Sequence, residues 1–156
     1  MKISLKLTQN VYFTIQKAFD NLFTEDDVRL NIIIKNHNYF IQQDSFRYEI
    51  GYNLKYHICN IKETNFLDIG KEYYKYQCQM LKDIENFDLN RFSDYLVFSN
   101  NHIAVLIYRK EKKVLCQVTY NNWEKDVYES LFLGELTNKT IQDWLKELDL
   151  YFIEKK

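Results

Sequence analysis

The sequence contains three histidines, the side chains best suited to general-base chemistry near neutral pH. His57 precedes Cys59 by two residues, so on a strand both would point the same way, as a thiolate–imidazole pair requires. Such neighbours are about 7 Å apart, however, which is too far for a direct hydrogen bond. The alternative is an exposed histidine beside an incidental thiol, and no third orienting group is implied. We therefore predict that the chain is not an enzyme.

Metal and cofactor sites are also not expected. Cys59, Cys78 and Cys116 have no second cysteine or histidine at the short spacings that zinc sites use. The three glycines are scattered, so no glycine-rich loop can hold a phosphate group. An odd number of cysteines in a chain with an ample apolar core indicates reduced thiols. We predict no metal, no cofactor and no disulfide framework.

Acidic residues gather in one stretch of the chain. Asp20, Glu25, Asp26 and Asp27 could present a negative patch that speeds the docking of a basic partner. The alternative is a solvated helix end, which is the usual place of such charge runs. The first reading makes Asp26 and Asp27 candidate partner-binding residues.

Arg109, Lys110, Lys112 and Lys113 form the main basic cluster. Together with exposed aromatic residues this cluster could bind single-stranded RNA. The alternative is a charged hairpin tip that discourages edge pairing of strands. A formal net charge of −1 provides no general attraction to phosphate backbones, so nucleic-acid binding is the second hypothesis.

The positions of these residues depend on the elements that carry them. In the first half, hydrophobic spacing predicts a strand at 2–7, a helix at 10–23 and two hairpins, with strands at 28–35, 39–41, 46–50 and 54–58. In the second half it predicts a helix at 66–87, strands at 95–98, 103–108 and 114–120, and a helix that begins near Thr137 or Thr140.

Two segments of the second half carry further expectations. The continuous apolar run 103–108 is typical of a central strand buried on both faces. Residues 123–133 fit either a short helix or an edge strand. The expected order is β-α-ββββ-α-βββ-α, an α+β fold with a mostly antiparallel sheet and three helices packed on it.

Length and composition indicate a single globular domain, residues 1–156. Hydrophobic residues make up 46% of the sequence and charged residues 28%, which suits one packed core. The first residues alternate polar and apolar types where a signal peptide would be continuously apolar, and no stretch reaches the ~20 apolar residues of a membrane span. We therefore expect a cytoplasmic protein with no membrane partner.

The closing region carries a resemblance to a known class of proteins. Residues 131–137, LFLGELT, and 142–145, QDWL, in a motifless domain rich in Asn, Lys, Ile and Tyr, resemble bacterial toxin-immunity proteins of the contact-dependent growth-inhibition type. The resemblance implies a stoichiometric inhibitor that binds a cognate toxin domain, often a nuclease. It implies no individual binding residue.

Partner-binding residues are therefore chosen on chemical grounds. Tyrosine and tryptophan contribute much of the binding energy of protein interfaces because they offer large contact areas with few rotatable bonds. With an acidic rim, the candidates are Asp26, Asp27, Glu72, Tyr73 and Tyr74. For Tyr73, packing in the protein core is the stronger alternative.

Overall fold

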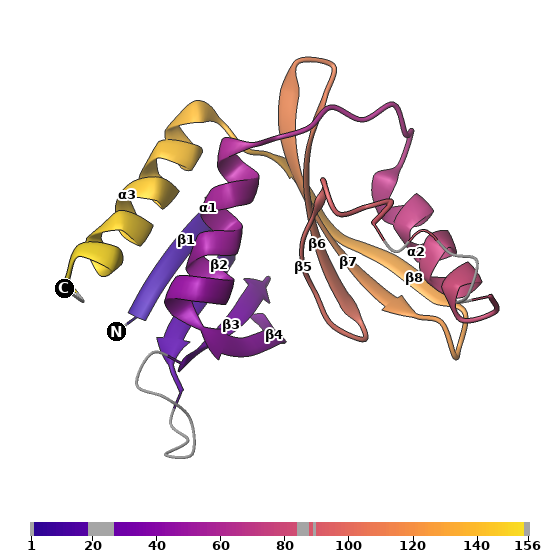
Figure 1. The fold of residues 1–156 in the computed structure, drawn as a ribbon, viewed down its shortest axis with the longest axis horizontal. Coiled ribbons are helices and arrows are strands. Elements are labelled where there is room, and N and C mark those ends of the chain that lie inside the picture. The colour runs from indigo at the N-terminus through magenta and orange to yellow at the C-terminus, as the bar shows by residue number, and fades with distance from the viewer. Residues whose placement is uncertain (1, 19–26, 84–87, 89, 155–156) are drawn as a thin grey trace. The chain divides into compact units, whose positions relative to one another are not determined.

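A computed structural model of the chain describes residues 2–18, 27–83, 88 and 90–154, with side chains as far as Tyr151. Its internal contacts divide the chain into two compact units (Figure 1). Unit 1 comprises residues 1–59 and 136–156, and unit 2 comprises residues 60–135. Each unit is described by itself. In the described part of the chain no helix combines the length and the apolar character that crossing a membrane demands.

Unit 1 is built on a four-stranded antiparallel sheet in which strands neighbour one another in chain order. Alternation along the strands places one apolar row per strand on a single buried face, for example Leu5, Phe13 and Ile32. Lys35 and Asn36 form the tight turn between the third and fourth strands with positive φ angles. The strands are β1 (Lys2–Thr8), β2 (Val11–Lys17), β3 (Asp27–Ile34) and β4 (His37–Ser45).

Helices α1 and α3 lie side by side over this sheet (Figure 1). A π-helical turn, η1 (Phe46–Gly51), leads directly into α1 (Tyr52–Cys59), and α3 (Asn138–Glu154) closes the described chain. Trp144 of α3 is 1% exposed, lies edge-on to Phe13 and donates its indole N–H to the carbonyl of Lys6 at 2.9 Å. The predicted last helix is confirmed, and Thr137 caps its start by accepting from the amide of Thr140.

Unit 2 contains a second four-stranded antiparallel sheet with α2 (Ile69–Met80) on one face. The expected central strand is confirmed, since β6 is an interior strand and its residues 103–108 are all buried. The ambiguous segment 123–133 is a turn followed by strand, not a helix. The strands are β5 (Leu96–Ser99), β6 (Ile103–Lys110), β7 (Lys113–Asn122) and β8 (Val127–Glu135).

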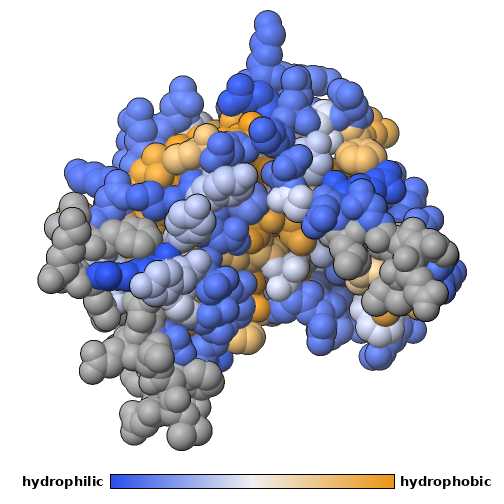
Figure 2. Space-filling view, in the orientation of Figure 1, coloured by the Kyte–Doolittle hydropathy of each residue, from blue (hydrophilic) through white to orange (hydrophobic). Residues whose placement is uncertain are grey.

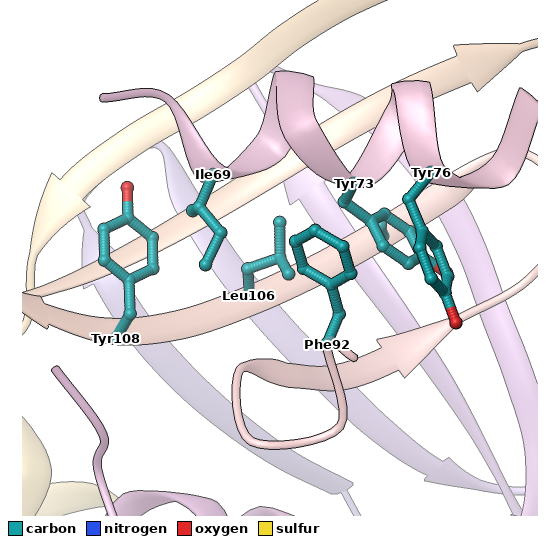
Figure 3. Close-up of a cluster of buried hydrophobic side chains, with 7 residues drawn as sticks. Ile69, Tyr73, Tyr76, Phe92, Leu106 and Tyr108 are labelled. Carbon is teal, nitrogen blue, oxygen red and sulfur yellow. The ribbon is translucent and has the colours of Figure 1, made fainter. Parts of the chain in front are cut away.

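Helix α2 packs through an aromatic stripe (Figure 3). Ile69, Tyr73 and Tyr76 follow the three- and four-residue spacing of one helix face and contact Leu106 of β6 and Phe92. The side chain of Asp68 caps the helix by accepting from the amide of Lys71. The predicted helix 66–87 is therefore present but shorter, and its expected residues 84–87 lie outside the described part of the chain.

The predicted order of elements is wrong, although the α+β class and the antiparallel pairing are confirmed. The order is ββββ-α-α-ββββ-α, in two sheets of four strands instead of one larger sheet. Two errors fall in the first 59 residues, and the predicted order also lacks the strand β8, because residues 123–133 fitted either a helix or a strand.

The first error is the helix expected at 10–23, where the structure has β2. β2 is an interior strand between β1 and β3, and it buries Thr14 as well as Val11, Phe13 and Ile15. Because both faces are partly covered, the alternation of polar and apolar residues is incomplete, and the spacing from Val11 to Ile15 imitates a helix turn. The remainder of this expected helix, residues 19–23, lies outside the described residues.

The second error is the hairpin expected at 46–58, where the structure has η1 and α1. Apolar residues occupy every second position from Phe46 to Ile58, which is the pattern of a strand. The same pattern contains two interleaved series with a spacing of four, and four residues are close to one helical turn. Phe46, Ile50, Leu54 and Ile58 are buried, whereas Tyr48, Tyr52 and Tyr56 are exposed.

Candidate partner-binding surface

Three of the five predicted partner-binding residues are carried by α2. Tyr73 is buried in the aromatic core of unit 2, as the core-packing alternative expected (Figure 3). Tyr74 is also largely buried but lies beside β8. Glu72 is two residues from Tyr74, so it points about 160° away around the helix axis, and it pairs with Lys75 at 3.7 Å. The structure therefore places Glu72 and Tyr74 on opposite flanks of α2.

Tyr74 connects α2 to the turn between β7 and β8. Its ring stacks on Tyr128 with centroids 5.5 Å apart, and its hydroxyl donates to Oδ1 of Asp126 at 2.7 Å. Asp126 has a φ of 51°, a conformation that aspartate tolerates better than most residues. The hydrogen bond to the Asp126 carboxylate, with burial, raises the pKa of Tyr74 above its ordinary value. The Tyr74 hydroxyl is therefore a fixed donor at neutral pH.

Gln117 of β7 organises the polar side of the contact between α2 and the sheet. It is 2% exposed; its Oε1 accepts from the amide of Gly70 at 3.1 Å and its Nε2 lies 3.3 Å from both Asp68 and Ser130. A Cβ added to Gly70 would lie 2.7 Å from Nε2 of Gln117. A glycine at this position therefore allows the Gln117 side chain to approach the backbone of α2 closely. Gln117 thus fixes the start of α2 against β7 and β8.

Burial raises the pKa values of two further groups near this network. The pKa of the Tyr108 hydroxyl is raised to about 12, chiefly by burial, with a smaller contribution from the charge of Asp68. Burial alone raises the pKa of the Cys116 thiol to about 12. Both groups stay protonated at neutral pH, so Cys116 is an inert thiol rather than a nucleophile.

The outer rim of this region is acidic and carries a tryptophan. Glu124, Asp126 and Glu129 are exposed on the β7–β8 turn and β8, against one exposed Lys125. Trp123 is 39% exposed at the start of the same turn. An exposed aromatic residue with acidic neighbours is suited to docking a protein with basic side chains. We name Trp123, Glu124 and Asp126 of this turn, together with Tyr74, the β7–β8 surface.

The remaining two predicted residues belong to the other unit. Asp27 begins β3 of unit 1, is half-buried, and its carbonyl accepts from the amide of Ala18 at 3.1 Å. Asp26 lies outside the described residues. The predicted five residues are thus distributed over two units, and their role in binding stays a prediction.

His57 and Cys59 lie on helix α1 and not on a strand, where they would point the same way. His57 is buried in α1 with Nδ1 3.0 Å from the carbonyl of Asn53, whereas Cys59 is exposed. Two residues apart on a helix, their side chains diverge. In the described part of the chain no three His, Cys, Asp or Glu side chains cluster as metal ligands would.

The basic cluster occupies the turn that the sequence predicted for it. Glu111 and Lys112 form the tip between β6 and β7 with positive φ angles. Arg109 is joined through its backbone to residues 62 and 64, and the ammonium of Lys110 donates to the carbonyl of Leu67 at 2.6 Å. The contact with Leu67 gives the Lys110 side chain a structural role, while RNA binding by the cluster stays an untested prediction.

Comparisons with known proteins agree with the resemblance seen in the sequence. No family model matches the chain, and no curated protein matches its sequence. Among solved structures, the chain is similar to CdiI from Burkholderia dolosa AUO158, a contact-dependent inhibition immunity protein. The match has a TM-score of 0.51 and covers 86% of this chain and 94% of that one, at 12% sequence identity. At that identity the match establishes a shared fold.

Sequence reasoning missed Trp123, Asp126 and Tyr128. The signal that could have located the turn is Asn121-Asn122 with Asp126, residue types that favour turns and left-handed backbone. Nothing in the sequence, however, indicated that this turn would meet Tyr74, because the contact joins residues 52 positions apart.

Proposed function

We propose that this chain is an immunity protein that binds and neutralises a cognate bacterial toxin domain without catalysing a reaction. The observation that carries the proposal is the fold shared with CdiI over 86% of the chain. It is supported by the resemblance of the sequence to the same class of proteins. We further propose that the protein acts in the cytoplasm and that the toxin is a nuclease.

The β7–β8 surface is our proposal for one contact region in unit 2. Nuclease domains bind polyanions and therefore carry basic side chains, which complement Glu124 and Asp126. Tyr74, among the residues predicted from the sequence, would hold Asp126 in place through its 2.7 Å hydrogen bond. We retain Asp26, Asp27, Glu72 and Tyr73 as candidate residues, Tyr73 through its support of the fold of α2.

Co-expression with the product of the adjacent upstream reading frame tests this function. Cells that express the neighbouring toxin domain alone should stop growing, and cells that also express this chain should grow. The two proteins should co-purify as a stoichiometric complex. Growth arrest that this chain does not relieve, with no complex on purification, would refute the proposal.

A further inference from the structure

The interleaved pattern of residues 46–59 leaves three aromatic side chains on the solvent side of η1 and α1. Tyr48, Tyr52 and Tyr56 are 76%, 62% and 50% exposed. They follow one another at intervals of four residues, so they form one stripe along the helical segment. In Figure 2, pale side chains of intermediate hydropathy gather along α1 on the viewed face. We name these three residues the tyrosine stripe.

Stability of unit 1 does not explain the stripe. The opposite side of the segment packs through Phe46, Ile50, Leu54 and Ile58, all buried. Tyrosine is a weaker helix former than the Lys, Glu or Gln that an exposed helix position ordinarily carries. Three large aromatic side chains therefore occupy positions where short-range stability favours other residues.

The stripe continues onto α3 through an ion pair. Lys55 donates to Asp149 at 2.6 Å, and this bridge separates two shallow hollows on the same face of unit 1. One hollow, of about 320 Å³, is lined by Tyr52, Lys55, Tyr56 and Cys59. The other, of about 440 Å³, is lined by Gln142, Leu145, Lys146, Asp149 and Leu150.

The charge of this face favours a protein over a nucleic acid. Lys55 is the one cation lining the first hollow, and it is paired with Asp149. The second hollow adds a single further cation, Lys146, which is too little positive charge to follow a phosphate backbone. Binding to phosphate groups requires cations that are not already paired. Aromatic rings with hydroxyl groups around a neutralised centre suit an apolar protein surface that also offers hydrogen-bonding groups at its edge.

The area of the stripe is also appropriate to a protein interface. At about 150–250 Å² for each aromatic side chain, the exposed fractions of the three tyrosines amount to roughly 300–450 Å². A standard interface buries about 800 Å² on each partner. The stripe alone thus provides about half of one partner's share, and the exposed Leu150 extends it.

We propose that the tyrosine stripe and the adjoining face of α3 form the main docking surface for the toxin domain. This inference rests on the proposed function and assigns the binding energy chiefly to unit 1. The toxin would present a largely apolar, uncharged patch to the stripe. Tyr52 and Tyr56 flank the first hollow and are the expected hot spots.

Affinity measurements with the purified toxin domain from the adjacent reading frame test the surface. Tyr52→Ala should weaken binding at least ~30-fold, and the triple variant Tyr48→Ala/Tyr52→Ala/Tyr56→Ala at least ~100-fold. Tyr52→Phe, which keeps the ring, should retain most of the affinity. Leu67→Ala, at a 92% exposed leucine of unit 2, is the matched control and should bind as the unaltered chain does.

The outcomes separate this inference from the proposed function. If the unaltered chain does not bind the toxin domain, the proposed function fails and the docking surface fails with it. If the unaltered chain binds and the triple variant, shown to be folded by circular dichroism, binds equally well, only the docking surface is wrong. If the unaltered chain is a dimer that the triple variant converts to monomers with no loss of toxin affinity, the stripe joins two copies of this chain and the inference is likewise overturned.

Discussion

At the scale of single residues, α2 is attached to its sheet by two different kinds of contact. Toward β6 the contact is aromatic and apolar, whereas toward β7 it is made by the polar side chains of Gln117 and Asn121. Asn121 donates to Gln77 at 2.7 Å, while Thr119 Oγ1 and Asn121 Oδ1 are buried with no hydrogen-bond partner in the described structure.

The bond between Tyr74 and Asp126 gives a prediction at this scale. We expect Asp126→Asn to lower the pKa of Tyr74, because the carboxylate is the largest cause of its elevation. It should also lower the free energy of unfolding by about 1 kcal/mol at neutral pH. Glu129→Gln, which alters an exposed carboxylate on β8, is the control. Tyrosinate absorbance titrations and urea unfolding measure the two effects.

The pH dependence of this effect has a definite sign. A pKa raised on folding contributes stability that is complete below the unfolded value of about 10 and is lost as the pH rises through the folded value. The difference in stability between the unaltered chain and Asp126→Asn should therefore be constant near neutrality and shrink above about pH 10. A difference that grows with alkaline pH would contradict the assigned cause.

At the scale of elements, the sequence was informative where one face of an element is buried and the chain follows one period. The last helix, with Trp144 and Leu148 on its buried side, and the strands β5, β6 and β7 of unit 2 have such patterns and were predicted correctly. The segment 46–58 satisfies two periods at once, so its pattern alone could not distinguish strand from helix. Packing against the sheet of unit 1 decides between them, and that information is not local.

The same ambiguity concealed the tyrosine stripe. In the predicted strands 46–50 and 54–58, Tyr48 and Tyr56 would share the buried face with Phe46 and would count as core residues, and Tyr52 would lie in the turn between them. In the helix they lie on the solvent side. A candidate surface of this kind follows from the sequence only after the secondary structure is known.

Two substitutions distinguish the helix from the predicted hairpin. In the predicted strand 54–58 Leu54 and Tyr56 would lie on one face and be buried alike, whereas in α1 Leu54 is buried and Tyr56 is 50% exposed. We therefore expect Leu54→Ala to lower the free energy of unfolding by about 2–5 kcal/mol and Tyr56→Ala by less than about 0.5 kcal/mol. Urea unfolding monitored by circular dichroism measures both values, and similar losses for the two variants would favour the hairpin.

At the scale of the whole molecule, unit 2 is an insertion between α1 and α3 of unit 1. The two ends of the insertion emerge close together on the second sheet. Arg109 of β6 bonds to the carbonyl of Lys62, and the adjacent β7 pairs Leu115 with Glu135. Because its two ends are close together, a folded unit 2 connects residues 1–59 to residues 136–156 in the way that a short loop would. When it is unfolded, a loop of over 70 residues must be closed instead.

This connectivity couples the stabilities of the two units. Each doubling of a loop costs about 0.6 kcal/mol in closure entropy, so replacing a short connection by the unfolded insertion costs unit 1 about 2 kcal/mol. We therefore propose, in accord with the single domain predicted from the sequence, that residues 1–156 unfold as one cooperative system.

The two tryptophans report on the units separately and allow the cooperativity to be measured. Trp144 belongs to unit 1 and Trp123 to unit 2. In Trp123→Phe the fluorescence follows unit 1, and in Trp144→Phe it follows unit 2. We expect the urea midpoint from fluorescence to equal that from circular dichroism within each variant. Comparing the two signals within one variant removes the effect of the substitution on stability. A fluorescence midpoint displaced from the circular dichroism midpoint in either variant would show that the units unfold independently and that the chain is two domains.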